Sequence, residues 1–177
     1  NNTAKGIKYR SVRGDGEQLT AYAKEIVANT SIPYLADQLL PENEGNNLKK
    51  QFQDLEFGAS LLTVYFGFNK NLENIGSKYY STFVFDDSLT NPKLIKANNT
   101  GNFESRSFTF VDYGRVDSDL CSKEKSVGVI CCMDYLSDWE NLDKENYEKK
   151  KEEVARIFID KLNKLLPGIK ECIEYYE

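Results

Sequence analysis

The stretch from residue 126 to residue 168 constrains the fold of this chain more than any other. It begins with an apolar segment that contains a glycine, SVGVICCMD, and continues through an acidic turn that carries Trp139. A long segment with helical periodicity follows and stops at Pro167 and Gly168. A strand, a turn and a long helix in this order predict a sheet against which one helix packs.

The helix of this stretch is expected to run from near Asp143 to Leu166. Asp143 is a suitable N-cap residue, because its carboxylate can accept hydrogen bonds from the first free backbone N–H groups. Pro167 and Gly168 provide the stop signal. An apolar stripe of the kind that packs on a sheet is formed by Tyr147, Val154, Phe158, Leu162 and Leu165.

Four segments with two-residue alternation are expected to be the central strands, at residues 61–68, 80–86, 107–113 and 127–133. Residues 61–68 are apolar on both faces, so both faces need a cover, one of which can be the helix and the other protein or an apolar ligand. The pattern predicts an α+β domain with a mainly antiparallel sheet and one long helix packed across it. Residues 87–106 are expected to form a long loop and residues 169–176 a short helix.

The first part of the chain is expected to begin with a β-hairpin, whose turn is Gly14-Asp15-Gly16. A further short strand is predicted at residues 25–28. Helical segments are predicted at residues 32–40, ending at Pro41, and near residues 48–55.

Composition excludes several classes of protein. The chain has 177 residues, of which 40% are hydrophobic and 12% aromatic, which is enough for one domain with a core. Its net charge of −5 argues against nucleic-acid binding, which needs a concentrated basic surface. The longest apolar run, residues 59–68, is about half of what a membrane-spanning helix requires.

The residues that most often perform acid–base chemistry or bind metals are scarce. There is no histidine, which removes the commonest general base and the commonest metal ligand. The cysteines Cys121, Cys131, Cys132 and Cys172 do not have the spacing of zinc ligands. We expect no metal, and reduced thiols in a cytoplasmic protein.

Three segments occur in an order that resembles a known family: EIVANTSIPYLADQLLPE at residues 25–42, FVDYGRVDSDL at residues 110–120, and residues 126–168. Together they resemble the middle of the phytoene-desaturase-like flavoproteins, which include carotenoid desaturases and retinol saturases. The resemblance implies an FAD-dependent oxidoreductase that exchanges a hydride with an apolar, isoprenoid-like substrate. It further implies that residues 1–31 belong to the FAD-domain side and residues 32–177 to the substrate-binding domain, with Asn29 and Thr30 nearest to the cofactor.

The glycine-rich G-x-G-x-x-G signature that binds the pyrophosphate of FAD is absent, and Gly14-Asp15-Gly16 is too short a match. The chain also begins at Asn1 without an initiator methionine. We therefore expect an internal fragment of a cytoplasmic enzyme, with a membrane-peripheral location left open for the whole protein. FAD would be held by the missing FAD domain, and the fragment would be inactive alone and able to associate with itself.

The candidate substrate-binding residues are aromatic side chains on the predicted strands: Tyr65, Phe83, Phe85, Phe108 and Phe110. Ligand cavities are mostly apolar, although the same residues can equally be core. A non-enzymatic domain that binds an apolar ligand or a protein partner is the alternative function. A ligand carrier predicts a closed cavity, and an interaction domain predicts a wide exposed apolar patch without one.

Overall fold

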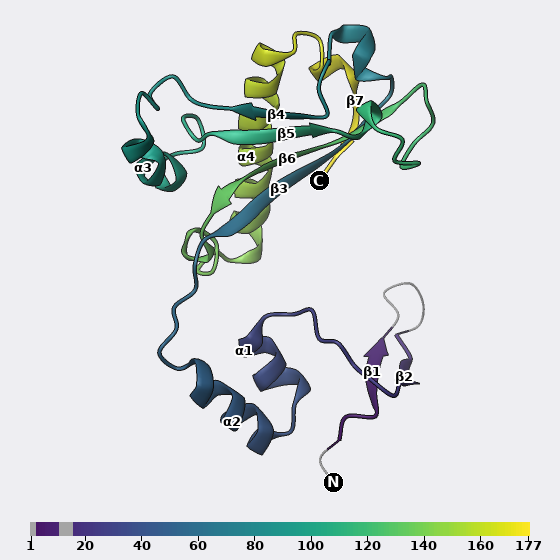
Figure 1. The fold of residues 1–177 in the computed structure, drawn as a ribbon, viewed down its shortest axis with the longest axis vertical. Coiled ribbons are helices and arrows are strands. Elements are labelled where there is room, and N and C mark those ends of the chain that lie inside the picture. Colours follow the sequence, from purple (N-terminus) through teal and green to yellow (C-terminus); the bar gives the residue numbers. More distant parts are fainter. Residues whose placement is uncertain (1–2, 11–15) are drawn as a thin grey trace. The chain divides into compact units, whose positions relative to one another are not determined.

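The computed structural model describes residues 3–10 and 16–177, and the chain divides into two compact units (Figure 1). The first unit ends at Glu56, and the second spans Phe57–Glu177. The functional boundary predicted after residue 31 falls inside the first unit.

The first unit begins with an antiparallel hairpin, as the sequence predicts. Strand β1 (Gly6–Arg10) pairs with β2 (Gln18–Tyr22). The predicted turn residues Gly14 and Asp15 lie outside the described residues. The strand predicted at residues 25–28 is not formed, because a strand needs a neighbour for its backbone hydrogen bonds and the described part of the chain supplies none there.

Helices complete the first unit. Helix α1 (Ile32–Tyr34) begins after Ser31, whose hydroxyl accepts a hydrogen bond from the Tyr34 N–H, and a π-helical turn (Leu35–Leu39) follows. Helix α2 (Glu42–Phe52) begins directly after Pro41, six residues earlier than the predicted start at residue 48. Gly45 of α2 packs against the π-helical turn, where a Cβ atom would lie 2.1 Å from the Ala36 carbonyl oxygen.

The second unit is built on a five-stranded sheet in the order β4-β5-β6-β3-β7, with every neighbouring pair antiparallel. The two longest strands, β3 and β6, pair along their whole length at its centre. The strands are β3 (Ser60–Phe68), β4 (Ser81–Val84), β5 (Phe108–Asp112), β6 (Ser126–Asp134) and β7 (Ile173–Tyr176).

Two segments differ from the sequence prediction. Residues 169–176 were expected to be helical, but they form a 3₁₀ turn (Lys170–Cys172) followed by β7, which pairs with β3. The edge of β3 offers backbone partners that an isolated segment lacks, and Ile and Tyr favour strands. The predicted loop at residues 87–106 contains a 3₁₀ turn (Pro92–Leu94) and the short helix α3 (Ile95–Thr100).

Helix α4 (Lys144–Leu165) crosses one face of the sheet and closes the core (Figure 1). The predicted N-cap is confirmed, since the Asp143 side chain accepts a hydrogen bond from the Asn146 N–H at 2.8 Å. Phe158 and Leu162 of α4 are fully buried, and the Phe158 ring contacts the Phe108 ring with centroids 5.4 Å apart. The α+β prediction, with an antiparallel sheet and one long helix across it, is confirmed.

Candidate functional site: the open face of the sheet

The side chains of each strand alternate between two faces of the sheet. In β3, Val64, Phe66 and Phe68 are buried on the side of α4, whereas Leu61 and Tyr65 point the other way and are more than half exposed. We call this second side the open face. The strand register assigns to it Leu61, Thr63, Tyr65, Gly67, Ser81, Phe83, Thr109, Val111, Val127, Val129, Cys131, Met133 and Tyr175.

None of the strand residues that the register assigns to the open face is charged. Glu177, directly after β7, exchanges two backbone hydrogen bonds with Tyr65, so its carboxylate lies on the side of the open face and accepts a hydrogen bond from the Tyr175 hydroxyl at 2.9 Å. Apolar and aromatic side chains remain in contact with water, with Tyr65 54% and Phe83 69% exposed. Exposed apolar surface of this extent is typical of a binding site.

The open face consists of rows that run across neighbouring strands. One row contains Phe83, Thr109, Cys131 and Thr63, which are paired in that order across β4, β5, β6 and β3. The adjacent row includes Val129 and Tyr65, and it ends at Glu177, whose backbone pairs with that of Tyr65. With strands spaced about 4.8 Å apart, five strands make a surface roughly 20 Å wide. Such a surface suits a flat or elongated apolar molecule.

Two adjacent cysteines of β6 point to opposite faces of the sheet. Cys131 lies half-buried on the open face, and Cys132 is buried against α4. Burial raises the pKa of the Cys131 thiol above its ordinary value and the pKa of Cys132 to about 12. Both are thiols at neutral pH, so neither is an activated nucleophile.

The five predicted substrate-binding residues do not all lie on the same face of the sheet. Tyr65 and Phe83 lie on the open face, and Phe85 follows β4 and is 64% exposed. Phe108 and Phe110 are buried beneath α4 on the opposite side, so they belong to the core and not to this site.

Sequence reasoning missed other members of the open face. Val129 and Cys131 carry the alternation signal of β6, but only the register shows that they lie beside Thr63 and Tyr65. Tyr175 was missed because its segment was expected to be helical.

The residues proposed nearest to FAD do not form a cofactor cradle. Asn29 and Thr30 are exposed in an extended segment of the first unit. Helix α4, the longest helix among the described residues, begins at Asp143 and carries Glu145 in its first turn, and negative side chains at a helix N-terminus disfavour the binding of a pyrophosphate there. The N-terminus of α4 therefore does not suit a pyrophosphate.

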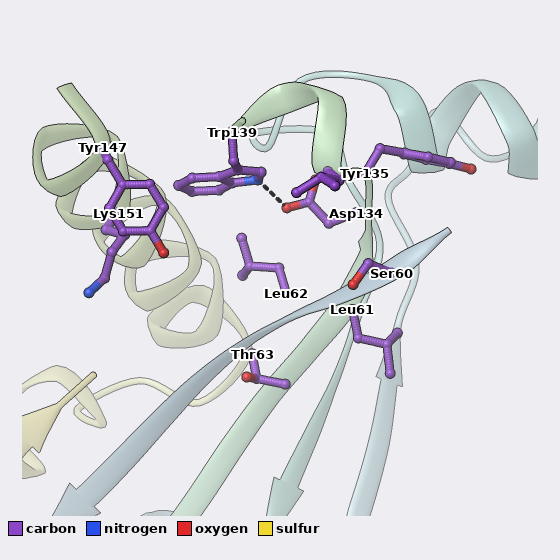
Figure 2. A pocket seen from close by; sticks show the side chains of 10 residues that line it. Ser60, Leu61, Leu62, Thr63, Asp134, Tyr135, Trp139, Tyr147 and Lys151 are labelled. Carbon is purple, nitrogen blue, oxygen red and sulfur yellow. Dashed lines mark hydrogen bonds between the residues drawn. The ribbon is translucent and has the colours of Figure 1, made fainter. Parts of the chain in front are cut away.

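A groove lies at one end of the sheet, beside the edge of β3 (Figure 2). It has a volume of about 370 Å³ and is bounded by residues 60–63 of β3 and by Trp139, Tyr147 and Lys151. Trp139 is held in place because its indole N–H donates to the Asp134 carboxylate at 2.6 Å. Leu62 points toward Trp139, and Leu61 and Thr63 lie on the other side of the strand.

Comparisons with protein-family models, with curated proteins and with solved structures find no match for this chain. Within the described part of the chain, no cluster of three His, Cys, Asp or Glu side chains is placed to hold a metal ion. No helix in that part is both long enough and apolar enough to cross a membrane.

Proposed function

We propose that the second unit is the substrate-binding portion of an FAD-dependent oxidoreductase of the desaturase or saturase type, and that its open face holds an apolar, isoprenoid-like substrate. The largely apolar, exposed open face is the observation that supports substrate binding. The resemblance of residues 25–42, 110–120 and 126–168 to the desaturase-like flavoproteins supports the reaction class. When bound, FAD would accept or supply the hydride.

The residues of the open face would bind the substrate by removing apolar surface from water. Each 100 Å² of apolar surface removed from water contributes about 2.5 kcal/mol. An anionic substrate would have to leave water without a partner among the open-face side chains, which is costly. The open face thus disfavours an anionic molecule, and Tyr65 and Phe83 provide aromatic contacts for an apolar one.

We also propose that the first unit packs against further protein, which in this assignment is the FAD domain. Its buried described residues are only Ala36 and Gly45, whereas apolar side chains such as Ile7 and Val27 are 52% and 93% exposed. A unit with so small a core gains stability when another surface covers these side chains. Asn29 and Thr30, in the same unit, remain the proposed positions nearest to the cofactor.

A non-enzymatic interaction domain is the second candidate, and one observation favours it. The open face is a wide exposed patch on the outer side of a sheet, which is the arrangement expected when the partner is a protein. The two candidates differ in what covers Cys131, because a small apolar molecule protects this thiol only in the first case.

Cys131 allows a direct test by alkylation with N-ethylmaleimide. Cys132 and Cys172 are buried. In a Cys121→Ser variant, Cys131 is therefore the thiol expected to react in the folded protein. We expect all-trans-retinol to slow the labelling of Cys131, and retinoic acid, which carries a carboxylate, to slow it less. A Val129→Lys change beside Cys131 should abolish the protection by retinol.

Other outcomes would count against the proposal. Absence of protection by retinol, together with concentration-dependent protection by the protein itself, would favour the interaction domain. Tight binding of FAD by this chain alone would contradict the assignment of the cofactor to another domain.

A further inference from the structure

We propose that one end of the open face is a binding site for a small organic ammonium ion, in which Tyr65, Tyr113 and Tyr175 contact the cation and Glu177 balances its charge. We call this arrangement, which is centred on Gly67, the tyrosine cup. The inference concerns this end of the open face, and it stands whether or not the remaining rows hold an apolar substrate.

The strand register brings the residues of the tyrosine cup together. Tyr175 of β7 lies directly opposite Gly67 of β3, and Gly67 lies opposite Val127 of β6. Tyr65 lies two residues before Gly67 and therefore on the same face of the sheet. Its backbone exchanges two hydrogen bonds with Glu177, and the side chains of two residues paired in this way lie next to each other. Two tyrosines and one carboxylate thus border Gly67.

Tyr113, directly after β5, bounds the tyrosine cup on the remaining side. The β5–β6 register, extended by one residue, places Tyr113 beside Val127. Its ring packs edge-to-face on the Tyr80 ring, with centroids 5.7 Å apart. The nearby Tyr80 hydroxyl raises the pKa of Tyr113 above its ordinary value, and Tyr65 adds a smaller contribution. The three phenols therefore lie at the same end of the open face.

Gly67 leaves the floor of the tyrosine cup bare. It does not adopt a positive φ, and a Cβ atom there would meet only the Cβ atom of Tyr175, at 3.8 Å, which is an ordinary contact. Neither the backbone nor core packing therefore requires a glycine, and a glycine within a strand is typical of a site that a ligand approaches closely. Since β7 already pairs with β3 here, a further strand on this edge would begin beside Val64 and would not cover Gly67.

Glu177 supplies a negative charge to the tyrosine cup. Its carboxylate accepts a hydrogen bond from Tyr175 but takes part in none of the ion pairs formed within residues 3–10 and 16–177. The cation–π contacts within the same ranges involve other rings and none of the cup. A carboxylate without a cation, beside tyrosine rings, attracts a positively charged ligand.

The tyrosine cup suits an alkylated ammonium ion better than a metal ion. A metal ion such as Ca²⁺ needs several oxygen ligands, whereas the cup offers one carboxylate. A quaternary ammonium ion spreads its charge over methyl groups that contact the faces of aromatic rings. Tyr65 and Tyr175 are 54% and 59% exposed, so their rings are accessible to such a ligand.

The test is an NMR titration of the whole chain with choline, followed at the backbone amides of Gly67 and Val127. The matched probe is 3,3-dimethyl-1-butanol, which has the shape of choline without its charge. We expect choline to shift both resonances in a saturable way. The neutral probe should bind about tenfold more weakly, because it lacks the attraction of a cation to the rings and to Glu177. Titrations at two protein concentrations separate ligand binding from self-association.

Four variants locate the site within the open face. Gly67→Val should abolish choline binding, because its side chain fills the cup, and valine is favourable in a strand. Glu177→Gln should weaken binding about threefold through the loss of an exposed charge. Tyr65→Leu should weaken it by a similar factor, whereas Tyr65→Phe, which keeps the ring, should bind like the wild type.

Thr63→Val is the control for these variants, because Thr63 lies on the same face of β3 but outside the cup. Thermal unfolding checks the fold of every variant. The exposed positions Glu177 and Tyr65 keep the test decisive if Gly67→Val does not fold.

Three results would overturn the inference: no shift at Gly67 and Val127 with choline, equal binding of choline and the neutral probe, or full binding of choline by a folded Gly67→Val variant. Phosphatidylcholine vesicles then identify the source of the ammonium group. Binding to vesicles that the same variants weaken would assign it to a lipid headgroup, and absence of such binding would assign it to a free molecule. Either outcome keeps the tyrosine cup as an ammonium site.

Discussion

Arg106 and Asp134 form the most deeply buried ion pair among the described residues. The Arg106 side chain is 2% exposed, and its guanidinium donates to Asp134 Oδ1 at 2.8 Å and to the Gly101 carbonyl at 2.6 Å. Its charge also lies 4.1 Å from the centre of the Phe103 ring. Since Asp134 also holds Trp139, the pair joins the end of β6 to the segment before β5 and to one wall of the groove.

Replacing Arg106 should therefore destabilise the protein strongly. Arg106→Met leaves the Asp134 carboxylate buried without its cation, and the expected loss in the free energy of unfolding is about 3–5 kcal/mol. Urea denaturation measures this loss. The control is Arg156→Met, because Arg156 pairs with Glu152 on the exposed side of α4 and such pairs contribute about 0–1 kcal/mol. Similar losses for both variants would refute a special role for the buried pair.

At the scale of elements, Gly128 of β6 allows aromatic side chains of the two neighbouring strands to pack closely against β6. A Cβ atom at Gly128 would lie 2.9 Å from ring atoms of both Phe68 and Phe110, and 3.1 Å from the Val111 carbonyl oxygen. These contacts are shorter than packed side chains allow. The glycine that marks this strand in the sequence thus makes room for two aromatic rings of the core.

Gly128→Ala is expected to reduce the free energy of unfolding by about 1–3 kcal/mol, because the added methyl group overpacks the core. Thermal and urea unfolding of the variant provide the measurement. Gly58→Ala is the matched control, since nothing lies within 4 Å of a Cβ atom at that position. A Gly128→Ala variant as stable as the control would mean that the two rings move apart without cost.

At the scale of the whole molecule, the second unit leaves one face of its sheet exposed, with apolar side chains on it. The open face is largely apolar, and α4 covers the other side of the sheet. Apolar surfaces of this kind associate when nothing else covers them. We therefore expect the chain to associate with itself through the open face when it is free in solution.

Tyr65→Lys should weaken this association about tenfold or more, because each copy would bring an unpaired charge into the contact. The fold should remain intact, since Tyr65 is 54% exposed. Sedimentation at several protein concentrations measures the change. Tyr79→Lys, at a residue that is 69% exposed and lies outside the strands, is the control. A wild-type chain that stays monomeric, or a Tyr65→Lys chain that unfolds, would contradict the prediction.

Local patterns in the sequence are sufficient to predict several parts of this protein. The alternation in residues 61–68, the apolar stripe from Tyr147 to Leu165 and the N-cap at Asp143 predict β3 and α4 close to their observed bounds. These features depend on contacts between residues near each other in sequence, so local sequence patterns are enough to predict them. The same patterns predict the α+β class.

Tertiary structure alone decided which faces of the strands remain open. Phe83 and Phe108 have equivalent alternation signals, yet Phe83 lies on the open face and Phe108 under α4, because strand register and the position of the helix determine burial. β7 forms because the edge of β3 supplies partners for its backbone hydrogen bonds, and Arg106 pairs with Asp134, which lies 28 residues further along the chain. Such pairings join segments that are distant in sequence, and no local pattern specifies them.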